Sequence, residues 1–345
     1  MRWKGFKTGL VGSTTAIIAI TVTVLASCVH APVTPPVIKI ADMGWQSNVP
    51  VVNIMKIILE DELGYEVEFV PTLWGPDTFA ALAKDPPDVD IYAENWMPNG
   101  QALVDEYVKD KGQVEIVATS YVGRQGFVVP SYVIEGDPRR GIDPIAPGLR
   151  SVEQLNDYVA LFDRDGDGRG DLVGGPEGWV CTHMNDWQLE SWELNYDQII
   201  QDEWISWSML TSDYYEGEPI LCYCYEPAWP ALLFGLTWLG TPAYSDEALA
   251  DYAIWQDWKA GANVTWKTGK ACGYPPSEVL VMVTDEFSQE YPDAYRFLQN
   301  WYIPVEDVTH LSVQIELHNL PAAYVALEYV KEHPELVRQW LAGIE

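Results

Sequence analysis

Residues 88–99 read DVDIYAENWMPN, and this stretch is typical of an α/β protein. Apolar and polar residues alternate over 88–93, which predicts a strand. Trp96 and Pro98 follow directly, and a proline at this point is typical of the loop that ends a strand. Ligands of α/β proteins gather at the ends of such strands, so the pattern predicts that Trp96 lies at a ligand-binding edge.

Strands and helices alternate in the N-terminal part of the chain. We expect strands at 37–41, 66–70 and 89–93, with helices between them at 50–63 and 78–84. This order is typical of a parallel sheet covered by helices. Further elements are expected as helices at 152–161, 187–194, 292–301, 305–319 and 322–341, and as a strand at 220–223.

The length of 345 residues exceeds one ordinary domain and indicates two lobes. A second lobe is expected after the strand at 126–129, and the chain returns to the first lobe near a strand at 279–283. We therefore assign 37–125 and 270–345 to lobe I and 126–269 to lobe II. Two strands that cross between the lobes predict a hinged clamshell.

Sixteen tryptophans are several times the usual share, and their positions are informative. Three aromatic clusters stand beside Pro or Gly at the ends of predicted strands, around Trp96, Trp179 and Tyr225. Aromatic faces that converge from separate loops suit organic cations, which they attract by cation–π interaction. The alternative is packing in the core, where most Trp and Tyr side chains lie.

The N-terminus resembles an export signal over residues 1–27. Basic residues precede a long apolar stretch, which ends in Leu25-Ala26-Ser27-Cys28. This ending resembles the lipobox of bacterial lipoproteins, in which the cysteine, here Cys28, carries the lipid. Residues 28–36 would then form a stiff, proline-rich tether. The alternative is an uncleaved signal anchor; both predict an extracytoplasmic protein, and one lipid would hold it at the outer face of a membrane.

The net charge of −31 excludes a nucleic-acid-binding protein on electrostatic grounds. Such an acidic field would concentrate a cationic ligand and speed its capture. An acidic surface also serves solubility, so the charge permits a cation-binding function without requiring one.

Four cysteines follow Cys28, at positions 181, 222, 224 and 272. An extracytoplasmic location permits disulfides, but their pairing cannot be read from a sequence. Cys222 and Cys224 lie on one predicted strand, where a mutual bridge is geometrically unfavourable. No CxxC pair or matching histidine spacing supports a zinc site.

Residues 163–171 read DRDGDGRGD and resemble a calcium-binding loop of the EF-hand type. The ligands would be the side chains of Asp163, Asp165, Asp167 and Asp171 and the backbone carbonyl of Arg169. The usual glutamate at position 12 is replaced by Gly174, so Glu177 or another group would have to complete the site. Close carboxylates repel one another without a cation. We expect a structural Ca²⁺ or similar ion here, against a solvated acidic turn, and no other cofactor.

Four motifs in one order resemble the substrate-binding proteins of glycine betaine/proline betaine ABC transporters. They are the strand and Asn-Trp-x-Pro segment at Trp96, the run 161–178 that leads into Gly-Trp-x-Cys at Trp179, the Tyr-x-Tyr-Glu-Pro segment at 223–227, and Gly273-Tyr274-Pro275. The resemblance covers residues 37–345. It implies a two-lobed periplasmic-binding-protein fold, type II-like, that closes on its ligand and catalyses no reaction.

The resemblance also implies the site. Family members hold a quaternary ammonium group in an aromatic box, and the matching positions are Trp96, Trp179 and Tyr225, with Trp45 as a further wall. The backbone N–H groups of Val180 and Cys181 are candidates to hold a carboxylate. Glu226, beside Tyr225, is a candidate to add negative charge for a cation, or only a surface residue at a strand end.

The sequence departs from the family pattern in two respects. Relatives that bind a betaine carboxylate often carry a histidine where this chain has Gly100 and Ala228. The family's frequent cysteine at the position of Gly175 is also missing, so Cys181 lacks a local partner. These departures do not affect the residues of the aromatic box. They weaken the expectation that the ligand carries a carboxylate.

The function implied is that of a lipid-anchored, extracytoplasmic component of an ABC importer, with a permease and its ATPase subunit as partners. Its ligand would be glycine betaine or proline betaine, captured as the lobes close. The alternatives are the same role for choline or trimethylamine N-oxide, or a secreted carbohydrate-active hydrolase with paired carboxylates such as Glu190 and Glu193. No hydrolase signature is present to support the last of these.

Overall fold

A computed structural model describes residues 37–72 and 75–344, which belong to one compact unit. The predicted export signal at 1–27, the lipidated Cys28 and the tether at 28–36 lie outside the described residues. They therefore stay predictions.

The first part of the sheet has the predicted parallel order. Strand β1 (Val37–Asp42) pairs in parallel with β2 (Glu66–Pro71) on one side and β3 (Ile91–Trp96) on the other. A late strand, β9 (Ser277–Thr284), then pairs antiparallel with β3. The expected α/β class is confirmed, and β9 brings the chain back beside β3.

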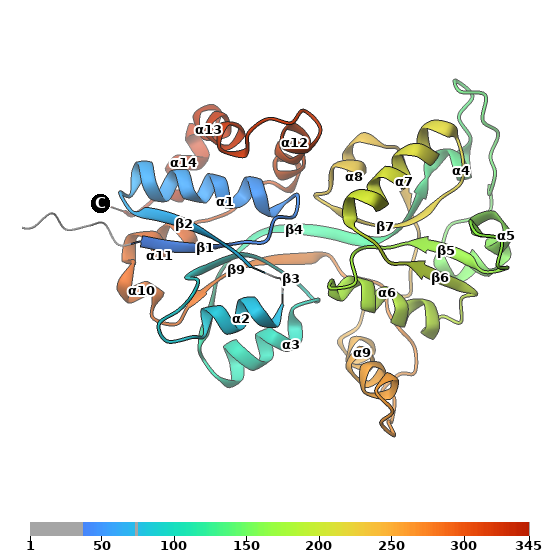
Figure 1. Cartoon of the computed structure of the whole chain (residues 1–345), viewed down its shortest axis with the longest axis horizontal. Coiled ribbons are helices and arrows are strands. Elements are labelled where there is room, and N and C mark those ends of the chain that lie inside the picture. The colour runs from blue at the N-terminus through green and yellow to red at the C-terminus, as the bar shows by residue number, and fades with distance from the viewer. Residues whose placement is uncertain (1–36, 73–74, 345) are drawn as a thin grey trace, which may run out of the picture. The chain divides into compact units, whose positions relative to one another are not determined.

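Helices cover both faces of this part (Figure 1). Helix α1 (Asn48–Ile57) continues through a π-helical segment, 58–62, and packs against α12 (Val305–Glu316) and α13 (Ala322–Glu332). The opposite face carries α2 (Pro76–Leu82) and α3 (Gln101–Val104), the latter extended by a π-helical segment at 105–110.

Strand β4 (Val114–Pro130) runs through the whole sheet. Its first part, as far as Gly123, pairs with β9, and from Arg124 onward it pairs with β7 (Leu221–Glu226). Its end pairs with β8 (Leu236–Trp238). One strand thus joins the part of the sheet that contains β1–β3 to the part that contains β5–β8.

The second part of the sheet is again layered between helices (Figure 1). Strand β5 (Gly170–Val173) pairs in parallel with β6 (Tyr196–Ile199) and β7. Helices α7 (Glu203–Glu216) and α8 (Trp229–Leu233) lie on one face, and α6 (Val180–Ser191) and α9 (Asp246–Lys259) on the other. The remaining helices are α4 (Ser131–Glu135), a 3₁₀ segment at 152–158, α5 (Val159–Phe162), α10 (Phe287–Glu290), α11 (Pro292–Gln299) and α14 (Pro334–Trp340).

Three expected elements differ in detail. The helix expected at 322–341 is two helices, because Pro334 cannot continue α13. The helix expected at 187–194 starts at Val180, seven residues earlier than its apolar pattern suggested. Of the two predicted crossings, β4 is a strand, whereas the return through 271–276 is irregular until β9 begins at Ser277.

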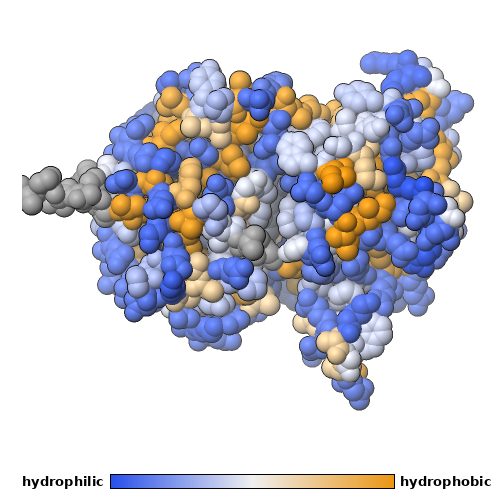
Figure 2. Space-filling model, viewed as in Figure 1, coloured by the Kyte–Doolittle hydropathy of each residue, from blue (hydrophilic) through white to orange (hydrophobic). Residues whose placement is uncertain are grey.

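Hydrophilic residues cover most of the face seen in Figure 2, in keeping with the excess of acids. Over the residues that the structure describes, no helix combines the length and the apolar character needed to span a bilayer.

Candidate ligand site

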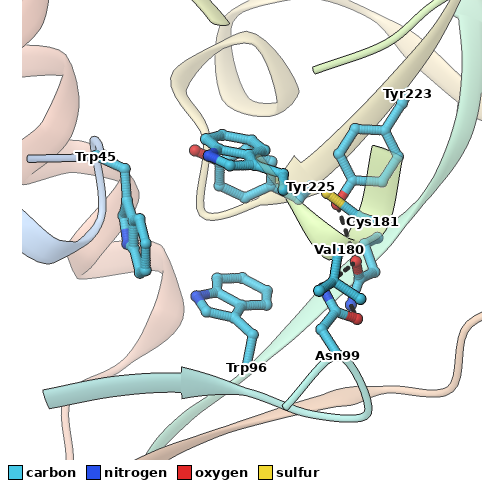
Figure 3. Close-up of a pocket in the computed structure, with 9 residues that line it drawn as sticks. Trp45, Trp96, Asn99, Val180, Cys181, Tyr223 and Tyr225 are labelled. Carbon is cyan, nitrogen blue, oxygen red and sulfur yellow. Dashed lines mark hydrogen bonds between the residues drawn. The ribbon is translucent and has the colours of Figure 1, made fainter. Parts of the chain in front are cut away.

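One cavity gathers aromatic residues from segments far apart in the sequence (Figure 3). Its lining consists of Trp45, Trp96, Asn99, Gln125, Trp179, Val180, Cys181, Tyr223 and Tyr225. Six of these were predicted as ligand-binding residues, and the structure brings all six together.

Tyr225 is the centre of the aromatic cluster. Its ring lies 5.6 Å from that of Trp96 and 6.1 Å from that of Trp179, in both cases edge to face. This is a favourable geometry for aromatic pairs. The indole of Trp45 stands across an open space from Trp96 and Tyr225 (Figure 3), which leaves room between the rings for a bulky group.

Secondary structure explains how each ring reaches the cavity. Trp96 is the last residue of β3, and Trp179 is the cap residue before α6. Tyr223 and Tyr225 lie two residues apart on β7, and alternate residues of a strand share a face. Trp45 lies in the turn between β1 and α1.

The indole of Trp96 fits only because residue 123 is glycine. A Cβ at Gly123 would lie 2.9 Å from two atoms of the Trp96 ring and 2.5 Å from the carbonyl oxygen of Glu226. The same glycine is the point where β4 changes its partner from β9 to β7.

Glu226 is not among the residues that line this cavity. Since Tyr225 faces the cavity, strand alternation turns the next residue to the other side. Burial raises the pKa of Glu226, and Arg124, its partner residue on β4, opposes this shift. The geometry does not support the predicted role of Glu226 in ligand binding.

Neutral polar side chains form one end of the cavity. Tyr223 donates its hydroxyl to Oε1 of Gln125 over 2.9 Å, and Nε2 of Gln125 donates to Ser277 over 2.8 Å. The amides of Asn99 and Gln125 lie 3.3–3.4 Å apart. Gln125 and Ser277 are buried, so this network is held inside the protein.

The N-terminus of α6 also opens onto the cavity through Val180 and Cys181. The first N–H groups of a helix have no partner within the helix and favour anions. Tyr274, from the predicted Gly-Tyr-Pro motif, donates to the carbonyl of Cys181 over 3.2 Å and so fixes this turn. Burial raises the pKa of the Cys181 thiol to about 12, which keeps it neutral.

A buried carboxyl, Glu94, lies behind the aromatic residues of the first part of the sheet. It accepts hydrogen bonds from the indole N–H of Trp45 at 2.6 Å, the hydroxyl of Tyr121 at 2.7 Å and the hydroxyl of Ser47 at 2.8 Å. Burial raises its pKa to about 7 even though these donors favour the charged form.

A second buried carboxyl, Glu203, lies behind Tyr225. The Tyr225 hydroxyl donates to it over 2.5 Å. Glu203 is the first residue of α7, and burial raises its pKa to about 7 against this hydrogen bond. Burial, the charge and hydrogen bond of Glu203 and, to a lesser extent, the charge of Glu94 raise the pKa of Tyr225 well above its usual range.

None of the described residues that line the cavity carries a positive charge. At position 100, where relatives often have a histidine, an added Cβ would lie 2.2 Å from Oδ1 of Asn95. Ala228 is fully buried at the start of α8. The missing histidines are therefore not replaced by another cationic side chain at the lining.

The acidic loop at 163–171 forms a separate cluster between α5 and β5. Carboxylate oxygens of Asp163, Asp165 and Asp171 lie within 4.8 Å of one another, whereas Asp167 is not part of this group. The side chain of Arg169 pairs with Asp197 at 2.5 Å. Three of the predicted ligands thus converge in a way that fits a hard cation.

Backbone N–H groups already bind several of these carboxylates. Gly166 and Gly168 donate to Asp163 over 2.7 and 3.0 Å, and Arg164 donates to Asp171 over 2.7 Å. Position 12 of the loop, Gly174, follows the strand β5, so the loop does not lead into a helix as an EF-hand does. The calcium site stays a prediction.

A family model described as the substrate binding domain of an ABC-type glycine betaine transport system matches residues 36–332. The chain belongs to this family. Because the family consists of substrate-binding domains, the hydrolase alternative is set aside, and the acids of the chain need no catalytic role.

Individual relatives are similar over part of their length. A glycine betaine/proline betaine-binding periplasmic protein of Escherichia coli is 28% identical over 46% of this chain and 48% of its own length. A glycine betaine-binding periplasmic protein of Dickeya dadantii is 21% identical over 56% of this chain and 59% of its own. The chain thus aligns with about half the length of these relatives.

Solved structures show the same two-lobed clamshell fold. A choline-binding protein of an ABC transporter, in complex with choline, has a TM-score of 0.67 at 18% identity and covers 89% of this chain and 92% of its own. The lactococcal protein in its closed form with glycine betaine has a TM-score of 0.65 at 16% identity over 89% and 99%. The predicted fold class is confirmed.

Five residues of the site were missed from the sequence: Glu94, Asn99, Gln125, Glu203 and Tyr223. A signal existed for two of them. Glu94 lies two residues before Trp96, and Tyr223 shares the strand face of Tyr225. Asn99, Gln125 and Glu203 follow no pattern of spacing. The cysteines at 181, 222, 224 and 272 are buried and free of disulfides.

Proposed function

We propose that the protein is the extracytoplasmic substrate-binding component of an ABC importer and captures a quaternary ammonium solute in the cavity of Figure 3. The observation that carries this proposal is the convergence of Trp45, Trp96, Trp179 and Tyr225 on one cavity. Family membership and the neighbours that bind glycine betaine or choline support it.

The chemistry of the ligand explains the composition of the site. A quaternary ammonium group is bulky and weakly hydrated and offers no N–H donor, so aromatic faces are its natural partners. Each face contributes about 0.5–2 kcal/mol once water is excluded. Three or four faces together are consistent with micromolar affinity.

The polar end of the cavity supports two classes of solute. The helix N-terminus at Val180 and Cys181 suits the carboxylate of glycine betaine or proline betaine. The neutral amides of Asn99 and Gln125 suit the hydroxyl of choline or the oxygen of trimethylamine N-oxide, and no positive side chain among the described lining residues favours a carboxylate.

Ligand capture and closure of the clamshell are coupled in this proposal. Trp45 and Trp96 belong to the part of the protein built around β1 and β3. Trp179 and Tyr225 belong to the part built around β7 and α6. A ligand that contacts both sets gains most when the two parts are close together. The higher affinity of the closed form than of the open form for the ligand drives closure. The closed form then delivers the solute to a membrane permease, which acts with its ATPase subunit.

Lipid anchoring at Cys28 completes the proposal. Labelling of cells with radioactive palmitate should mark the full-length protein, and the variant Cys28→Ala should remain unlabelled. Equal labelling of the two proteins would exclude Cys28 as the lipidated residue.

A titration panel tests the function. Calorimetry with glycine betaine, proline betaine, choline and trimethylamine N-oxide should give saturable binding of at least one solute with one site per chain. The same titration with L-proline, which lacks the quaternary nitrogen, is the control and should show weaker binding. If none of the four solutes binds, the proposal is wrong.

A further inference from the structure

Two buried carboxyls bind rings that wall the cavity, and neither carboxyl lines it. Glu94 is 0% exposed and binds the indole N–H of Trp45, and Glu203 is 8% exposed and binds the hydroxyl of Tyr225. Each carboxyl therefore contacts a ring that the proposed function assigns to the ammonium group.

The contacts of Glu94 favour its charged form. The indole N–H of Trp45 can only donate, so Oε2 of Glu94 must accept. Hydroxyls of Ser47 and Tyr121 occupy the same carboxyl from two further directions. Among the described residues, no Lys or Arg forms an ion pair with Glu94 or Glu203. A buried carboxylate without a cationic partner is costly, and a positively charged ligand would offset that cost.

We propose that Glu94 and Glu203 are positioning residues that place negative charge behind the aromatic walls and thereby select solutes with a net positive charge over zwitterions. This inference rests on the proposed function and narrows it to monocations such as choline. A zwitterion brings its own carboxylate close to the two buried charges, whereas a monocation brings none.

The titratable groups that face the two carboxyls are two tyrosines, an aspartate and a glutamate. Tyr121, on β4, and Tyr225, on β7, both have pKa values raised well above the usual range by burial. Asp202 and Glu316 also face Glu203 and add negative charge, and burial raises the pKa of Glu316. The pKa values of Glu94 and Glu203, raised by burial to about 7, support a change of charge in this range.

Linkage then gives the direction of the pH effect. A bound cation favours ionised carboxylates, so its binding releases protons near pH 7, and its affinity increases with pH. If the bound cation lowers the pKa of one carboxyl by one unit, the affinity for that cation is about tenfold higher at the alkaline limit than at the acidic limit.

The experiment is calorimetry with choline and with glycine betaine at pH 5.5 and 8.5, and at pH 7 in two buffers of different ionisation enthalpy. Neither the choline hydroxyl nor the ammonium group titrates in this range. The parent should bind choline about tenfold more tightly at pH 8.5 than at pH 5.5 and release protons at pH 7. Glycine betaine should show a smaller change in both quantities.

Two variants assign the effect to the carboxyls. Glu94→Gln keeps an oxygen that accepts from Trp45 but removes the charge, and Glu203→Gln does the same at Tyr225. Each should weaken choline binding at pH 8.5 by about tenfold, flatten the pH profile and reduce proton release. Glu190→Gln is the matched control. Glu190 accepts a hydrogen bond of 2.9 Å from the indole N–H of Trp255 and does not line the cavity. Its replacement should leave all three quantities unchanged.

The outcomes separate this inference from the proposed function. Binding of choline or glycine betaine without pH dependence or proton release would overturn the role of the carboxyls and leave the aromatic site intact. Equal loss of both ligands in Glu94→Gln and Glu203→Gln, with an unchanged pH profile, would show a purely structural role. Binding of neither ligand by the parent would overturn both proposals. Proton release is measured on the parent, so the test stands even if a variant does not fold.

Discussion

The rings of Trp96 and Tyr225 meet edge to face, with centroids 5.6 Å apart and planes at 81°. Their strands are not neighbours, because β9 and β4 lie between β3 and β7 in the sheet. The contact therefore spans the two intervening strands, and the Trp96 ring passes over Gly123 of β4. A loop-borne ring, that of Trp179, joins them through Tyr225.

Replacing Trp179 by alanine should weaken binding of the preferred quaternary ammonium solute. Loss of one aromatic face removes about 0.5–2 kcal/mol, which corresponds to about 2- to 30-fold in Kd. Calorimetry measures this change. Trp258→Ala removes an exposed indole on α9 and is the control. If both variants bind as the parent does, Trp179 is not part of the site.

Replacing Gln125 by leucine should destabilise the protein. The substitution leaves the hydroxyls of Tyr223 and Ser277 without the partner they have in the buried network. Unsatisfied buried polar groups cost about 1–3 kcal/mol each, so urea unfolding should show a loss in this range. Gln256→Leu, at an exposed position on α9, should change stability by less than about 0.5 kcal/mol. Equal effects of the two substitutions would contradict the importance of the network.

The unliganded protein should lose stability between pH 5 and pH 8 through its two buried carboxyls. Burial raises the pKa of Glu94 and of Glu203 from 4.5 to about 7. The folded state thus binds more protons than the unfolded chain between these values, and the stabilisation present below pH 4.5 is lost as the pH rises through 7. Each carboxyl accounts for up to about 3 kcal/mol.

Urea unfolding at the two pH values measures this loss. The difference in unfolding free energy should be smaller in Glu203→Gln than in the parent, because the amide does not titrate. A parent protein with equal stability at pH 5 and pH 8, or a variant with the same difference as the parent, would show that these carboxyls titrate normally.

Calcium should raise the thermal midpoint of the protein if the loop at 163–171 holds an ion. Asp163, Asp165 and Asp171 supply converging carboxylates, and a ligand that binds only the folded state stabilises it. Asp163→Asn should abolish the increase. Asp197→Asn is the control, since Asp197 pairs with Arg169 and lies outside the cluster. No shift in the parent at millimolar calcium would favour the solvated acidic turn.

The sequence predicted the fold well where local patterns were strong. The strands around β1, β2 and β3 have clear alternation, and their parallel order follows from the helices between them. The prediction of element boundaries failed where contacts between distant segments accompany the start of a helix. The first turn of α6, which begins at Val180, receives a hydrogen bond from Tyr274 to the carbonyl of Cys181, ninety-three residues away in sequence, and no local pattern records that contact.

The aromatic residues of the site were predictable, and the polar residues were not. Large rings beside turn residues are conspicuous in a sequence, as at Trp96 and Trp179. Gln125 and Glu203 are ordinary residues whose role arises only when β4 and α7 bring them to Tyr223 and Tyr225. Glu226 was chosen for its position beside Tyr225, and strand alternation turns it away from the cavity.

Gly123 leaves the Trp96 indole directly against the backbone of β4. The orientation of that ring is thus set by backbone, which substitutions elsewhere in the cavity leave in place. Substitution of Asn99 or Gln125 is consequently expected to leave the position of that ring unchanged, even where it costs stability through the buried network. We therefore expect that the solute preference can change through substitutions at the polar end of the cavity, in natural relatives or in the construction of biosensors.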